Sequence, residues 1–84
     1  MLDGQGEFLE FVVPQSSRIT GKSIKDCNFP HAANICAVLG KSGAYVPRGN
    51  DVIESGDRVV VFTTPEQRPR VERFFQPTQR LRLR

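Results

Sequence analysis

The stretch Arg58-Val-Val-Val-Phe-Thr63 decides the fold of this chain. Its four consecutive apolar residues are β-branched or aromatic, which is the usual composition of a β-strand. A near-continuous apolar run favours a central strand with both faces covered. The residues that follow, Thr64-Pro-Glu-Gln67, predict the start of a helix, with a threonine cap, proline at the first helical position and glutamine completing a capping box.

The predicted C-terminal helix carries an apolar stripe. Val71, Phe74 and Phe75 recur at positions i, i+3 and i+4, so one side of the helix is expected to pack against the sheet. Pro77 ends the helix, because proline cannot continue it.

Three further strands are predicted upstream of the central one. Residues 7–13 are rich in aromatic and β-branched side chains and are closed by Pro14. Residues 34–39 and 44–46 form two more strands, joined by the tight glycine-bounded connection Gly40-Lys-Ser-Gly43.

A short helix is expected between the first two strands. Thr20 can cap a helix over Gly21–Asp26, since its hydroxyl can accept from a free amide of the first turn. Ile24 and Cys27 lie three residues apart and would share the inner side of that helix.

These elements predict an α+β domain: a small, largely antiparallel β-sheet of about four strands, with a short helix after strand 1 and a C-terminal helix. A chain of 84 residues allows one domain. We expect residues 1–6 to be disordered or the start of a linker, residues 7–76 to form the domain and residues 77–84 to form a basic tail.

Charge is unevenly distributed along the chain. Residues 68–84 hold six arginines and one acid, a net charge of +5, whereas residues 1–67 hold six bases and eight acids, a net charge of −2. No apolar run is long enough for a membrane helix, and no charged-then-apolar leader opens the chain. Two cysteines without a Cys-x-x-Cys spacing suit a reducing cytoplasm.

Three local patterns suggest chemistry, but each lacks a feature that the chemistry requires. Thr20-Gly-Lys-Ser23 resembles the end of a phosphate-binding loop, but Ser16 stands where the leading glycine should be. Cys27, His31 and Cys36 are metal-ligand types without the paired short spacings of a structural zinc site, so no metal site is predicted. A Cys/His nucleophile pair lacks a third, orienting partner, and a Cys27–Cys36 disulfide is expected only by oxidative accident.

Neither the acids nor the arginines indicate a reaction. The carboxylates at positions 26, 51, 54 and 57 are scattered over turns and strand ends, with no cleft to pair them, so we predict no catalytic residues and no enzyme. The arginines at 68, 70, 73, 80, 82 and 84 could attract nucleic acid or anionic lipid. The tail has no aromatic residue to stack on bases, and a solvated helix face with a disordered end is the favoured interpretation.

The ordered set of motifs resembles the TrkA C-terminal domain, also called the C-terminal domain of the regulator-of-potassium-conductance (RCK) module. The resemblance covers about residues 7–76. It rests on Ile19-Thr-Gly-Lys-Ser-Ile24, Asn34-Ile-Cys-Ala-Val-Leu39, Val46-Pro47, Ile53-Glu-Ser-Gly-Asp-Arg-Val-Val-Val61 and Val71-Glu-Arg-Phe-Phe75. The closing segment up to Pro77 is similar to the end of a Trk potassium-uptake regulator.

The resemblance implies a cytosolic, non-enzymatic regulatory domain that pairs with a second copy and transmits the state of a small ligand to a membrane potassium transporter. It would lie at the inner face of the membrane through that transporter. Some relatives bind cyclic di-AMP between two copies, so this or another nucleotide is the ligand that the resemblance suggests. Mapped by position, the ligand residues would be Asn28, Pro30, His31, Ala33, Asn34, Ile35 and Pro47. Asn28 departs from the pattern, since a basic residue is often found near this position.

A homodimer is also expected from the residues themselves. The first strand places apolar groups on both faces, among them Phe8, Leu9 and Phe11, which is more than two small helices can cover. Two alternatives stay open: the same domain type within an antiporter or anion transporter, and a small basic nucleic-acid-binding protein. The favoured reading predicts no nucleic-acid partner.

Overall fold

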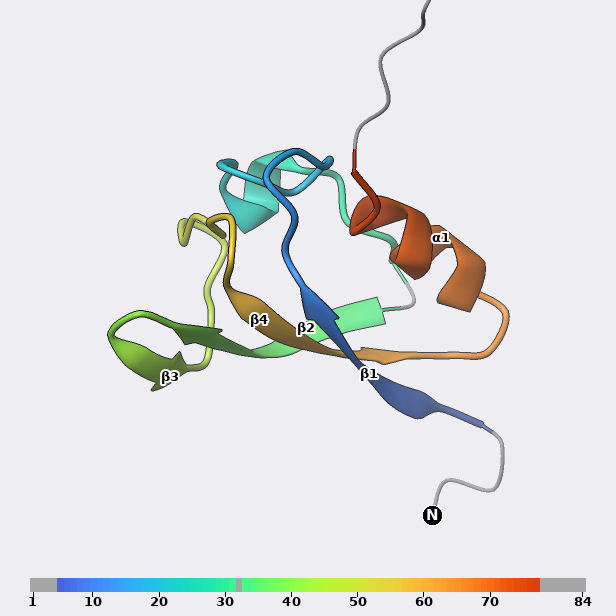
Figure 1. The fold of residues 1–84 in the computed structure, drawn as a ribbon. Coiled ribbons are helices and arrows are strands. Elements are labelled where there is room, and N and C mark those ends of the chain that lie inside the picture. The colour runs from blue at the N-terminus through green and yellow to red at the C-terminus, as the bar shows by residue number, and fades with distance from the viewer. Residues whose placement is uncertain (1–4, 32, 78–84) are drawn as a thin grey trace, which may run out of the picture.

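In a computed structural model of the chain, residues 5–31 and 33–77 are described, and they form one antiparallel sheet with a helix on one side (Figure 1). The strand order is β1-β4-β2-β3. The elements are β1 (Glu7–Val12), the 3-10 helix η1 (Ile24–Asp26), β2 (Ala33–Gly40), β3 (Gly43–Tyr45), β4 (Arg58–Thr63) and α1 (Arg68–Phe74). The predicted α+β class, with a four-stranded antiparallel sheet and a C-terminal helix, is confirmed. The segments predicted as a disordered or linker start (residues 1–6) and as a basic tail (residues 77–84) lie largely outside the described residues.

Strand β4 occupies the centre of the sheet, as its apolar run predicts. It pairs with β1 from Glu7↔Thr63 to Val12↔Arg58 and with β2 from Ala33↔Thr63 to Leu39↔Arg58. The expectation that both of its faces are covered is wrong. Val59, Val61 and Thr63 are fully buried, but Val60 and Phe62 on the other face are only half-buried, because α1 and the connection before η1 lie on one side of the sheet (Figure 1).

Aromatic rings seat α1 on the sheet. The Phe75 ring stacks on Phe11 of β1, with 4.4 Å between centroids and an interplanar angle of 7°. Phe29, from the loop after η1, meets Phe74 edge to face at 5.3 Å and Phe75 at 6.2 Å. Val71, Phe74 and Phe75 are all buried, which confirms the predicted apolar stripe. The helix is therefore held by one strand and one loop at the same time.

Two loops complete the core below α1. Ile19, from the connection between β1 and η1, and Ile53, from the turn region before β4, are completely buried. The amide of Gly21 donates to the Ile53 carbonyl at 2.7 Å, so the two loops are joined by their backbones as well as by their side chains. Cys27 is buried and Ile24 packs against the core, as the predicted shared inner side requires.

The helix after β1 is shorter than expected. Only Ile24–Asp26 is helical, as a 3-10 turn, and Ser23 rather than Thr20 precedes it. The Thr20 hydroxyl donates to the Pro14 carbonyl at 3.0 Å and lies 2.8 Å from the Ser17 hydroxyl, so its side chain is engaged by the segment before it and not by the start of η1. Gly21 adopts a φ of 75°, which turns the chain where the first helical residue was expected.

Helix α1 begins three residues later than its predicted cap implies. Thr64 does not cap a helix; residues 65–67 form a turn, and Gln67 stands at the N-cap position without a side-chain hydrogen bond. Pro69 explains the delay. In a helix that started at Thr64, Pro69 would lie in the interior, where it lacks the required N–H and its ring clashes with the preceding turn. At the first turn of α1 neither problem arises.

The predicted hairpin between β2 and β3 is confirmed. Gly40 pairs with Gly43 across a two-residue loop, and Gly43 has a φ of 116°, which favours glycine. Strand β3 ends at Tyr45, one residue earlier than expected, and Val46 beyond it is 76% exposed.

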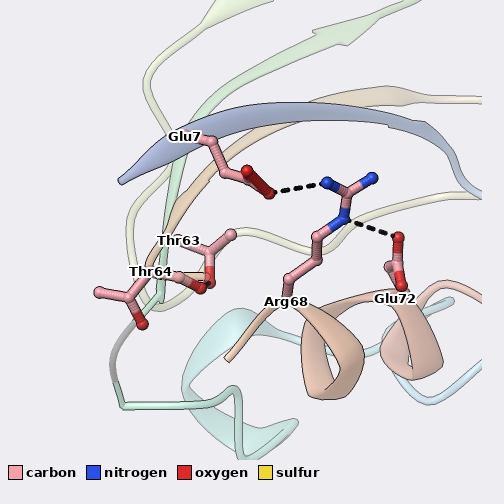
Figure 2. A network of polar contacts seen from close by, with 5 residues as sticks. All are labelled: Glu7, Thr63, Thr64, Arg68 and Glu72. Atoms are coloured by element: carbon pink, nitrogen blue, oxygen red, sulfur yellow. Dashed lines mark hydrogen bonds and ion pairs between the residues drawn. The ribbon is translucent and has the colours of Figure 1, made fainter. Parts of the chain in front are cut away.

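A surface ion-pair cluster fixes the start of α1 relative to β1. The Arg68 guanidinium contacts the Glu7 carboxylate at 2.9 Å and the Glu72 carboxylate, one turn along the helix, at 3.1 Å (Figure 2). The hydrogen bond to Glu72, together with the charge of Glu7, raises the pKa of Arg68 above its ordinary value. Beside this cluster the buried Thr63 hydroxyl donates to the Thr64 carbonyl at 3.0 Å, where the chain leaves the sheet.

Replacing Phe11 with leucine tests the aromatic seat of α1. We expect Phe11→Leu to lower the free energy of unfolding by about 1–2 kcal/mol, because the ring stacking on Phe75 is lost and the volume is only partly refilled. Urea unfolding followed by circular dichroism measures the change. Val46→Ala, at an exposed position, serves as the control and should change stability by less than about 0.5 kcal/mol; equal effects of the two substitutions would contradict this account.

Candidate ligand-binding site

The loop after η1 holds three of the seven ligand residues predicted from the sequence. Asn28, Pro30 and His31 line a cavity of about 370 Å³ between this loop and α1. The loop keeps its shape because Phe29 points inward against Phe74 and Phe75. Asn28 has a φ of 60°, a left-handed conformation that asparagine accepts more readily than most residues. Asn28 and His31 are exposed at the cavity, with Phe29 as the anchor between them.

The opposite wall of this cavity comes from residues that the sequence interpretation did not include in a site. They are Arg18, from the connection after β1, and Arg70, Arg73 and Phe74 of α1. The Arg18 guanidinium carbon lies 5.4 Å from the centre of the Phe74 ring, within cation–π range. Arg70 and Arg73 are three residues apart, and this spacing predicts that they share one face of the helix. Nothing in the sequence indicates that Arg18 joins them.

The other four predicted ligand residues do not line this cavity. Ala33, Asn34 and Ile35 form the start of β2, where Asn34 is exposed, Ala33 is half-buried and Ile35 belongs to the core. Pro47 follows β3 and is half-buried. As a ligand set, all seven residues remain a prediction.

A larger cavity, of about 860 Å³, lies between the β2–β3 hairpin and the turn before β4. None of the predicted ligand residues lines it. Its charged lining residues are two bases and two acids: Lys41, Arg58, Glu54 and Asp57. Partial burial raises the pKa of Tyr45 at its wall, and the charges of Asp51, Asp57 and Glu54 act in the same direction. An electrostatically balanced cavity with acids near its tyrosine is a poor site for an anion.

The two cysteines differ in environment. Cys27 is buried, and its thiol donates to the Ile24 carbonyl at 3.1 Å, whereas Cys36 is partly exposed in β2. Burial is the main cause that raises the pKa of Cys27 above its ordinary value of 9.0. Both thiols are free. Within residues 5–31 and 33–77 no group of three or more histidine, cysteine or acidic side chains could hold a metal ion, and no helix is long and apolar enough to cross a membrane.

The sheet face opposite α1 is apolar and uncovered. Phe8, Val12 and Leu39 are 54%, 61% and 42% exposed on it. Phe8 meets the half-buried Phe62 edge to face, with 5.2 Å between ring centres. The ion pair between Arg58 and Glu10, at 3.5 Å, lies on the same face. We call this surface, made by Phe8, Glu10, Val12, Leu39, Arg58, Val60 and Phe62, the open face.

A small antiparallel sheet with one covered face, one open face and a loop-lined polar cavity defines a small α+β domain. The sequence pattern of the TrkA-C domain matches residues 8–76, so the chain belongs to the TrkA-C domain family. A curated relative, the Trk system potassium uptake protein TrkA homolog 1 of Methanosarcina mazei, is 33% identical over 72 residues. That match covers 86% of this chain and 16% of the relative, so the chain spans about a sixth of its length.

Solved structures share the fold. The RCK_C domain dimer of S. agalactiae BusR in complex with c-di-AMP is 30% identical, with a TM-score of 0.69; the match covers 81% of this chain and 93% of that domain. S. agalactiae BusR in complex with its busAB-promotor DNA matches with the same identity, TM-score and share of this chain, and with 35% of the BusR chain. The RCK_C-like fold expected from the sequence is therefore present.

The buried state of Cys27 leads to a prediction about thiol reactivity. At pH 8 we expect iodoacetamide to modify Cys36 at least about tenfold faster than Cys27, because the reactive thiolate of Cys27 is suppressed by burial. Mass spectrometry of the timed reaction measures both rates, and 6 M urea should abolish the difference. Equal rates in the folded chain would contradict the burial of Cys27.

The same burial predicts a dependence of stability on pH. Because the Cys27 thiol ionises at a higher pH in the folded chain than in the unfolded one, its contribution to stability is complete below pH 9 and declines as the pH rises above 9. Cys27→Ala should reduce that alkaline decline in urea unfolding, whereas Cys36→Ala should leave it in place.

Proposed function

We propose that this chain is a non-catalytic regulatory and dimerisation domain of a potassium-transport protein. It works on the cytosolic side, senses a small ligand and transmits the ligand's state to the membrane transporter. Membership of the TrkA-C family and the resemblance to TrkA potassium uptake proteins support this role. The observation that carries the proposal is the match to nearly the whole RCK_C domain of BusR, whose structure is a dimer in complex with c-di-AMP.

Cyclic di-AMP or another nucleotide is the proposed ligand. The proposed binding residues are those mapped from the sequence: Asn28, Pro30, His31, Ala33, Asn34, Ile35 and Pro47. The exposed side chains of Asn28, His31 and Asn34 support the assignment, because each can donate or accept a hydrogen bond without disturbing the core. Ile35, being buried, would support the site through the position of the strand.

A second copy of the chain is the proposed occupant of the open face. One helix and two loops cover only one side of the sheet, which leaves large apolar side chains such as Phe8 and Val12 in water. A two-fold partner would place the same face against itself. The Glu10–Arg58 pair suits such an arrangement, since it offers both an acid and a base to the partner. A change in the relative arrangement of the two copies would then carry the ligand's signal.

A thermal-shift measurement tests the ligand. With cyclic di-AMP about a hundredfold above its dissociation constant, the melting temperature should rise by about 10 °C, since a ligand that binds only the folded chain adds stability by mass action. ATP and NAD test other nucleotides. Asn34→Ala should reduce the rise, and Asn50→Ala, at an exposed turn, is the matched control. No shift with any nucleotide would contradict the proposed sensing role.

Light scattering tests the dimer. At micromolar concentration the chain should have twice the mass of one copy, and Phe8→Ser should return it to a monomer because the paired surface loses a large exposed apolar side chain. Val52→Ser, which removes an exposed apolar group outside the open face, should leave the dimer intact. A wild-type chain that is monomeric would overturn the dimer proposal.

One alternative is favoured by a specific observation: the same domain as the ligand-sensing end of a DNA-binding regulator. BusR, 30% identical over the matched region, is known in complex with promotor DNA. Salt-dependent DNA binding by the full chain, compared with a variant lacking residues 78–84, tests for contacts made by this domain itself. The sequence encoded upstream of Met1 in the parent gene would separate a potassium regulator, an antiporter and a DNA-binding parent.

A further inference from the structure

The cavity between α1 and the loop after η1 concentrates positive charge. Three of its lining residues are arginines, at positions 18, 70 and 73, and none is an acid. Among the described residues, the ion pairs involve Arg58 and Arg68 instead. Three guanidinium groups around one cavity, without a carboxylate, repel one another. A bound anion would remove that repulsion.

Packing, rather than charge, brings these arginines together. Arg18 is held over the ring of Phe74, which is itself 5% exposed and in contact with Phe29. Arg70 and Arg73 lie on neighbouring turns of α1, whose position is set by the stacking of Phe75 on Phe11. The positions of the backbone segments that carry the three cations are therefore established before any ligand arrives, which lowers the entropic cost of binding.

The chemistry of the lining selects phosphate. Guanidinium groups form bidentate hydrogen bonds to phosphate oxygens, and several of them suit a multiply charged group better than a single carboxylate. The Asn28 amide and the His31 ring add polar groups on the loop side. A volume of about 370 Å³ lies within the usual range for small-molecule pockets.

We propose that this cavity binds the phosphate groups of a small phosphorylated ligand, with Arg18, Arg70 and Arg73 as the phosphate-binding residues. The proposal extends the sensing role above, and its regulatory consequence rests on that role; the binding itself does not. The larger cavity near Tyr45 is not a rival, because acids and bases balance in its lining.

Inorganic pyrophosphate is the probe that isolates the phosphate interaction from the rest of a nucleotide. Isothermal titration calorimetry of the 84-residue chain should show saturable binding of one pyrophosphate per chain. Each of Arg18→Gln, Arg70→Gln and Arg73→Gln should weaken binding about tenfold, the usual effect of losing one charge-assisted hydrogen bond. Arg48→Gln removes an exposed arginine outside both the cavity and the open face and should change the affinity less than about twofold.

Several outcomes would overturn the site. They are an equal loss with Arg48→Gln, a loss of binding that follows only from deleting residues 78–84, and binding to vesicles of phosphatidylcholine with phosphatidic acid but not to pyrophosphate. Circular dichroism melting checks that Arg18→Gln leaves the fold intact. If Arg18→Gln disturbs the fold, Arg70→Gln still tests the site, because the cation–π contact with Phe74 is made by Arg18.

The test also separates this site from the regulatory role. One outcome is that the three substitutions weaken pyrophosphate binding but leave potassium transport by the parent protein unchanged. That outcome would support the site and contradict its coupling to transport. The other outcome is that pyrophosphate does not bind, while cyclic di-AMP raises the melting temperature equally in the wild-type chain and in the three variants. That outcome would overturn the phosphate site and support the residues mapped from the sequence.

Discussion

The stacking of Phe75 on Phe11 is the contact on which the rest of the domain depends. It fixes a helix of only seven residues against a four-stranded sheet, although a helix of that length has little stability of its own. The same ring meets Phe29, so the loop after η1 is positioned by the helix and not only by its neighbours in sequence. The polar cavity lies between this loop and α1, and it exists because the contacts of Phe75 hold the loop, the helix and β1 together.

One-sided coverage is the second constraint. The elements outside the sheet all lie on the α1 side, and the fully buried valines of β4 point to them. The alternate residues of the strand, Val60 and Phe62, are left half-buried on the open face. A domain of this size hides too little of its apolar surface within itself, and the proposed second copy would complete the burial that the chain begins.

The electrostatics of the described residues divide by location. The cavity beside α1 has three arginines and no acid, whereas the larger cavity beside Tyr45 has an equal number of acids and bases. The net charge of the chain conceals this division, since Arg68 is engaged by two carboxylates while its neighbours on α1 are directed to the cavity. In the described part of the +5 segment, residues 68–77, the arginines are thus of two different kinds.

The sequence alone was sufficient for the features that depend on local pattern. The apolar run from Val59 to Phe62 indicated the central strand, the Gly40–Gly43 spacing indicated the hairpin, and the motif order indicated the family. Local rules failed where two of them competed: the capping pattern at Thr64 lost to Pro69, and Thr20 bonded backward to Pro14 instead of starting a helix. The coverage of only one face of β4 was not visible either, because apolar character along a strand does not tell which neighbour covers it.

The position of Arg18 was decided only by the tertiary structure. Nothing within several residues of Arg18 distinguishes it from a solvated arginine, and its partner Phe74 is 56 positions away. A contact between residues so far apart in sequence depends on how the helix packs, and helix packing is a property of the assembled core. The residues themselves determined the strands, the turns and the family, since these follow from backbone preferences; the basic cavity arose when the aromatic rings brought α1 down onto the sheet.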